Sequence, residues 1–198
     1  MASFGMSELR QIVKLAVEEL DREDRYIAGS FARNPAYWAT AKKRFPGIPH
    51  LDDEKYYQRV TARALLASFP LRVELEDQAE PGNNEHFDLV LYSGEKRVAV
   101  GELQRCMRAT IERDAKPVQD DILKLKRLAP AGYSQFIVLF TLNPSDPRGT
   151  TDKWILSLRE QLQLRQDLQH TRYIFHTEGY QRPNGPSSWE FGVMGFLL

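Results

Sequence analysis

Two acidic residues stand at matching places in two neighbouring apolar segments. Asp88 lies near the start of HFDLVLYS, and Glu102 lies near the end of KRVAVGEL. Both segments predict short strands, and a tight polar turn joins them into a hairpin. A carboxylate that is partly removed from water costs several kcal/mol unless a positive charge compensates it. The pair therefore predicts a cation beside the two acids, and a divalent metal is the obvious candidate.

The length of the turn decides whether the two acids share a face of the hairpin. Opposed residues of an antiparallel pair point the same way, so an odd-numbered turn such as SGEKR or GEK places both acids on one face. An even-numbered turn separates them. Gln104 follows Glu102 by two positions and shares its face if the strand is regular. Oxygen ligands of this kind suit magnesium or manganese better than zinc.

The segments around the hairpin predict an α/β fold. Amphipathic spacing and proline positions predict four helices, at residues 7–22, 52–68, 118–129 and 151–168. Apolar or alternating runs predict four further strands, at 71–77, 136–142, 171–178 and 189–198. This order describes a mixed central sheet flanked by helices in three layers, α/β/α.

The remaining segments are less regular. Residues 26–50 predict a short helix or two and a loop, and residues 105–117 predict a loop or partial helix. We expect one domain overall. Residues 1–50 would form a helical extension packed on the core, and residues 51–198 would form the core itself.

Composition narrows the classes of function. The chain has 198 residues, 42% of them apolar, with 27 Lys plus Arg balanced by 27 Asp plus Glu. There is no overall basic field, so any nucleic-acid surface must be local. A single cysteine, Cys106, excludes an internal disulfide. No apolar run reaches the length of a membrane span and no signal peptide is recognisable, so we expect a cytoplasmic protein that makes no membrane contact.

The pattern around the hairpin resembles the PD-(D/E)XK nuclease superfamily, which has the restriction-endonuclease-like fold. The pattern is a helix, a strand, a strand that starts with Asp, a turn, a strand that ends in Glu-x-Gln, and a second helix. In this chain it covers residues 52 to 128 as DDEKYYQRVTARALLASF, LRVELED, HFDLVLY, KRVAVGELQ and VQDDILKLKRL. The chain departs from the superfamily at Phe87, where Pro is usual, and at Gln104, where the signature Lys belongs.

The resemblance implies a metal centre. Asp88, Glu102 and the carbonyl of Leu103 would bind Mg²⁺ or Mn²⁺, which offsets charge on a phosphate while water attacks phosphorus in line. In many members a Glu from the preceding helix completes the site. Glu54 is the candidate here, and Glu74 or Glu76 are the alternatives.

The missing signature lysine leaves the activity open. The superfamily's lysine positions or activates the attacking water and stabilises negative charge, and a neutral amide does the first more easily than the second. Active members with Gln or Glu at this position are known. A lysine could also reach in from elsewhere, with Lys124 or Lys116 as candidates.

Basic residues near the hairpin are candidates for contacts with nucleic acid: Arg105, Arg108, Lys116 and Lys124. The alternative is a charged surface that only meets solvent.

Three functions follow, in order of support. The first is a metal-dependent phosphodiesterase, an endonuclease-like enzyme acting on DNA. The second is a catalytically inactive relative that binds nucleic acid or a protein partner. The third is an unrelated α/β enzyme with a carboxylate pair. A homodimer is an open alternative to a monomer, because dimers are common among relatives that cut both strands.

Overall fold

The computed structural model describes residues 4–33, 54–78, 85–106, 111–129, 132–144, 159–160, 162, 164, 168–177 and 189–198. Within them, six strands form one sheet in the order β1-β2-β3-β4-β6-β5. Their bounds are β1 Arg72–Gln78, β2 His86–Ser93, β3 Lys96–Arg105, β4 Ser134–Pro144, β5 His170–His176 and β6 Trp189–Leu197. The described helices are α1 Met6–Arg33, α3 Glu54–Ser68 and α4 Ile111–Leu128.

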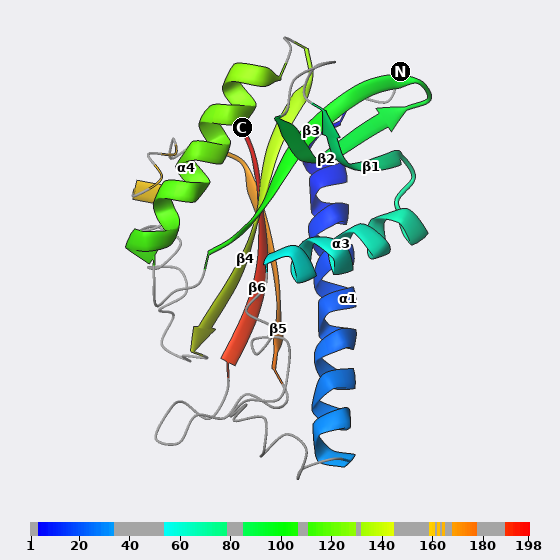
Figure 1. Ribbon diagram of the computed structural model, residues 1–198, viewed down its shortest axis with the longest axis vertical. Helices are drawn as coiled ribbons and strands as arrows, with labels where there is room; N and C mark the ends of the chain where they lie inside the picture. The colour runs from blue at the N-terminus through cyan, green and yellow to red at the C-terminus, as the bar shows by residue number, and fades with distance from the viewer. Residues whose placement is uncertain are drawn as a thin grey trace.

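The sheet is mixed, as the sequence predicts. β3 and β4 pair in parallel, and the other neighbouring strands pair antiparallel. A parallel pair needs a crossover between its strands, and α4 supplies it. α1 and α3 cover one face of the sheet and α4 covers the other (Figure 1). The α/β prediction with a mixed sheet flanked by helices is therefore confirmed.

The face under α1 and α3 carries the largest apolar cluster. On α1, five fully buried side chains follow the predicted helical spacing: Leu9, Ile12, Val13, Ala16 and Leu20. They share this cluster with Tyr57, Val60 and Leu65 of α3. α1 also approaches β6 closely, because a Cβ added at Gly195 would come 2.8 Å from Val13. The described part of residues 1–50 is thus packed into the same core as the sheet.

α1 is longer than the predicted helix at 7–22. It continues to Arg33 because no proline interrupts the segment and ion pairs along the exposed side, such as Arg25 with Asp21, support it. The helix predicted at 52–68 is confirmed as α3, which ends at Ser68, just before Phe69 and Pro70. None of the helices in the described part of the chain is apolar over a length that could span a bilayer.

The segment 105–117, predicted as a loop or partial helix, is partly helical, because α4 begins at Ile111 and runs through Pro117. Residues 107–110 lie outside the described residues. Pro117 lies inside the helix, beyond its first turn, where it cannot donate the backbone hydrogen bond to the carbonyl four residues earlier. Most of the helix predicted at 151–168 lies outside the described residues, and only residues 159–160 of it are seen as helical.

Candidate active site

The hairpin between β2 and β3 sets the positions of the two acids. Leu89 pairs with Gly101 and Val90 with Val100, and the pairing of β2 with β3 ends at Leu89 and Gly101, just before the two acids. The turn has only two residues, Gly94 and Glu95, with Gly94 at φ 62°. Such an even turn was expected to separate the acids.

A bulge in β3 changes the register of the hairpin by one residue. Leu91 pairs with Ala99, whereas Tyr92 pairs with Arg97, so Val98 is one extra residue on the β3 side. One extra residue shifts the register by one and turns every later side chain to the other face. Beyond Leu89 and Gly101, Asp88 accepts a hydrogen bond from Gln58 of α3 while Glu102 lies against Lys124 of α4, so the two acids are directed to different sides of the sheet.

The carboxylate of Asp88 is held between β3 and α3. Its Oδ2 accepts hydrogen bonds from the backbone N of Leu103 at 2.8 Å and from Nε2 of Gln58 at 3.3 Å. Gln58 Nε2 also donates to the carbonyl oxygen of Leu103 at 3.1 Å. One amide on α3 therefore fixes both the first acid and the backbone carbonyl predicted as a ligand.

The carboxylate of Glu102 faces α4. Val100 on the same side of β3 packs against Leu125, and Glu102 Oε1 lies 2.7 Å from Nζ of Lys124. Glu102 is 2% exposed and Lys124 is 22% exposed. The contact is an ion pair that lacks hydrogen-bond geometry, so within the described residues Oε1 is a buried oxygen without a hydrogen-bond partner. Lys124 also donates to the carbonyl of His86 at 3.0 Å.

Burial and a neighbouring negative charge act together on Glu102. Burial raises its pKa from 4.5 to about 9, the charge of Asp88 adds to the rise, and Lys124 opposes it. The two carboxylates lean toward different helices, yet each lies in the electric field of the other. This is the behaviour of an acid pair that a cation would stabilise.

A third acid joins this group from α4. Burial raises the pKa of Asp121 to about 6; Lys124 opposes the rise, and the charges of Asp88 and Glu54 add to it. The sequence analysis did not select Asp121. The available signal was its spacing, because it lies one helical turn before Lys124 and on the same side of the helix.

The other predicted residues make contacts of their own. Oε2 of Glu54 accepts a hydrogen bond from the backbone N of Arg105 at 3.1 Å, which ties the start of α3 to the end of β3. Gln104 is half-buried, and since β3 pairs with β4 without a break, it shares the α4 side with Glu102. Glu74 lies 3.5 Å from Arg72.

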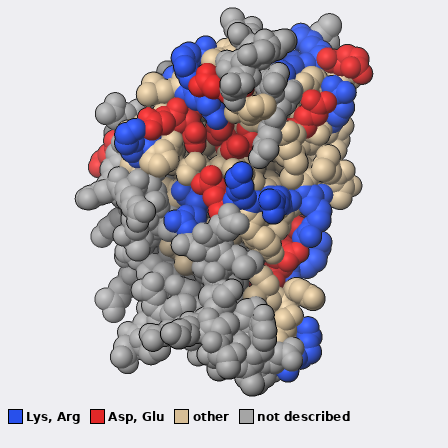
Figure 2. Space-filling view, in the orientation of Figure 1, with Lys and Arg blue, Asp and Glu red and all other residues tan. Residues whose placement is uncertain are grey.

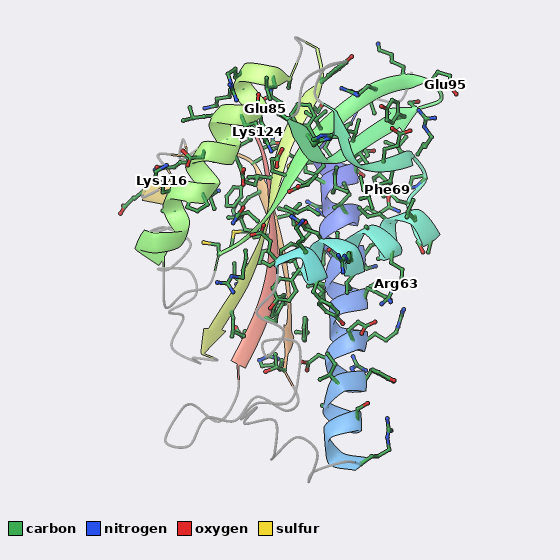
Figure 3. All side chains as sticks on the ribbon, in the orientation of Figure 1. Arg63, Phe69, Glu85, Glu95, Lys116 and Lys124 are labelled. Atoms are coloured by element: carbon green, nitrogen blue, oxygen red, sulfur yellow. The ribbon has the colours of Figure 1, made fainter. Side chains whose placement is uncertain are left out.

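Four predicted residues are not placed at the pair. Lys116 pairs with Asp120 at 2.6 Å on the exposed side of α4, and Figure 3 shows it pointing away from the sheet, whereas Lys124 lies on the side that meets the hairpin. The side chain of Arg105 is half-buried at the end of β3. Arg108 and the side chain of Glu76 lie outside the described residues.

The side chains and the carbonyl at the acid pair offer oxygen atoms as donors. In the part of the chain that the structure describes, no three His, Cys, Asp or Glu side chains form a group that could hold a metal. An ion here would take two carboxylates and the Leu103 carbonyl, with water for the rest, as Mg²⁺ commonly does. A carbonyl has two lone pairs, so Leu103 can accept from Gln58 and still bind an ion. The observation that favours such an ion is the nearness of Asp88 to the buried Glu102, whose pKa burial and Asp88 raise despite the contact with Lys124.

Comparison with known proteins identifies no relative of this chain. A scan of protein-family models, a search of curated proteins and a search of solved structures each found no match to this chain.

Proposed function

We propose that this protein is a metal-dependent phosphodiesterase that cleaves DNA, built on the plan of the PD-(D/E)XK nucleases. The arrangement of α3, β1, the β2–β3 hairpin, α4 and the parallel strand β4 supports this proposal. So does the nearness of Asp88 to Glu102 on the neighbouring strand, whose pKa it raises.

The buried Glu102, with Asp88 close to it, carries the proposal. A carboxylate that is 2% exposed beside a second carboxylate destabilises the folded chain. Ionisable groups with strongly shifted pKa values cluster at functional sites. The only cation in contact with Glu102 among the described residues is Lys124, which also serves the His86 carbonyl. A divalent ion would favour the charged form of Glu102 and balance its charge together with that of Asp88.

Each group then has a definite task. Asp88, Glu102 and the Leu103 carbonyl would hold Mg²⁺ or Mn²⁺, which supplies charge neutralisation at the phosphate and a more acidic water. Gln58 keeps Asp88 and the Leu103 carbonyl in place. Lys124 brings an ammonium group to Glu102 from α4, where the superfamily has a lysine two positions further along the strand. Glu54 holds the backbone at Arg105.

The direct test is cleavage of supercoiled plasmid and of single-stranded DNA with Mg²⁺, Mn²⁺ or EDTA. We expect metal-dependent cleavage that Asp88→Asn and Glu102→Gln both abolish. Glu95→Gln is the matched control, because Glu95 is 96% exposed at the tip of the hairpin (Figure 3). Cleavage that survives in either site variant, or that is absent from the wild-type protein with both metals, contradicts the proposal.

The second candidate is an inactive relative that only binds nucleic acid or a protein. Gln104 at the signature position favours it, as does the ion pair that already occupies Lys124. Retention of DNA in a binding assay without cleavage under any metal would select this candidate. For either function we propose a cytoplasmic protein, and dimer formation would be decided by its mass in solution.

A further inference from the structure

A pocket opens beside Asp88 on the side of the sheet that α3 covers. Its volume is about 330 Å³, which falls in the range of small-ligand sites. Among the described residues it is lined by Lys55, Gln58, Arg59, Leu75, Asp88 and Leu103. Lys124 and Asp121 do not line it, whereas Asp88 and Leu103, two of the proposed metal ligands, do, so the pocket adjoins the proposed metal site.

One wall of the pocket is basic. Lys55 and Arg59 are exposed and lie one turn apart on α3, with Gln58 beside them on the same face of the helix. In Figure 2 Lys and Arg gather over α3, next to a group of Asp and Glu that lies toward α4 and the hairpin. The basic wall therefore adjoins an acidic surface, and a phosphate would settle against α3 and away from the carboxylates.

The opposite wall is apolar. Leu75 of β1 pairs with Leu89, which belongs to the core under α1 and α3, so Leu75 is on the α3 side of the sheet. It is nevertheless 43% exposed. Leu103, which is 1% exposed, adds a buried apolar surface next to Asp88. An exposed leucine in a pocket offers a contact for a flat, largely apolar group such as a nucleobase.

We infer that this pocket binds one unpaired nucleotide of a single DNA strand, with its phosphate on Lys55 and Arg59 and its base on Leu75. A base within a duplex is stacked on both sides and paired along its edge, so it cannot enter without leaving the helix. The inference rests on the proposed function in naming DNA as the ligand. It adds that single strands are preferred over intact duplex.

Binding without metal separates this inference from the proposed cleavage. The probe is a short fluorescein-labelled single strand of mixed sequence, and the same strand in a duplex, titrated in EDTA and followed by anisotropy. The paired variant Lys55→Ala/Arg59→Ala is compared with Arg10→Ala/Lys14→Ala, which removes two exposed basic residues at the same spacing on α1. Leu75→Ala is compared with Leu66→Ala, since Leu66 is 63% exposed on α3.

We expect the wild-type protein to bind the single strand more tightly than the duplex. The Lys55 and Arg59 variant should weaken single-strand binding about tenfold at low salt and reduce the slope of log Kd against log salt by about one. Leu75→Ala should weaken it about threefold, a loss of the size expected for part of one base contact. The two control variants should bind as the wild type does.

Three results would overturn the inference: no binding of the single strand, equal binding of the duplex, or equal losses in the α1 control. Each is independent of cleavage. If single-strand binding does not depend on Lys55, Arg59 and Leu75 while metal-dependent cleavage still requires Asp88, only this inference is wrong. If single-strand binding depends on the pocket and no metal supports cleavage, the proposed function is wrong and the binding site remains.

Discussion

Glu102→Gln should make the metal-free protein more stable at neutral and alkaline pH. In the folded chain the pKa of Glu102 is about 9, against an ordinary value of 4.5. At pH 7 the folded protein must therefore hold a proton that the unfolded chain has released. Each pH unit above 4.5 costs about 1.4 kcal/mol, so the penalty at pH 7 is about 3 kcal/mol. Glutamine has the same shape and carries no such penalty.

Glu102→Gln loses part of this gain in stability because Lys124 then contacts a neutral amide in place of an acid. The loss is small, since Lys124 keeps its hydrogen bond to the His86 carbonyl and is 22% exposed. For a chain of this length, about 3 kcal/mol corresponds to roughly 6–12 °C in Tm, which is the upper limit of the expected rise.

The pH dependence gives the sharper test. Because the pKa is raised by folding, the stability that Glu102 contributes is complete below pH 4.5 and is lost as the pH rises toward about 9. The difference in Tm between Glu102→Gln and the wild type should be near zero at pH 4.5 and should grow up to pH 9. Thermal unfolding in EDTA, followed by circular dichroism at several pH values, measures it.

A divalent metal should narrow the difference in Tm between Glu102→Gln and the wild type. An ion bound at a concentration of a hundred times its Kd stabilises the wild type by about 2.7 kcal/mol, and the Gln variant gains less because it lacks a ligand. Glu95→Gln should follow the wild type throughout. A Glu102→Gln variant that is less stable than the wild type at pH 8, or a difference that does not change with pH, would refute the account of a strained acid pair.

Three further predictions concern other parts of the structure. Lys124→Gln should lower cleavage at least about tenfold, and adding Gln104→Lys should restore part of it, as measured by plasmid nicking. Gly101→Ala should destabilise the fold by about 1–3 kcal/mol in urea denaturation, because the new Cβ would lie 2.3 Å from a ring carbon of Phe136. Arg63→Ala, which removes the exposed pairs with Glu19 and Glu23, should cost no more than about 1 kcal/mol in the same assay.

The main elements could be predicted from the sequence because their patterns are strong and local. The helix at Glu54–Ser68 follows from apolar spacing and from Pro70, and the β4 strand follows from a continuous apolar run. The parallel pairing of β3 and β4 was not stated in advance. It depends on contacts between segments separated by all of α4, which no local pattern contains.

Parts of the candidate site could not be predicted from the sequence. The register of the hairpin depends on Val98, whose bulge has no sequence signature such as glycine. The role of Asp121 depends on which side of α4 meets the hairpin, and its neighbour Asp120 has an equal claim from sequence alone. Lys124 was named as one of two lysines that might reach the acids, and only the packing of α4 distinguishes it from Lys116.

The bulge at Val98 makes the number of residues in this hairpin as consequential as their identity. A single insertion or deletion between Tyr92 and Ala99 would leave the other strand residues unchanged. It would nevertheless move the later side chains of one strand to the opposite face of the sheet. Two compensating length changes, one in the turn and one at the bulge, would cancel. Homologous chains should therefore vary in length here only in such pairs, a pattern that an alignment would record as a gap matched by a nearby insertion.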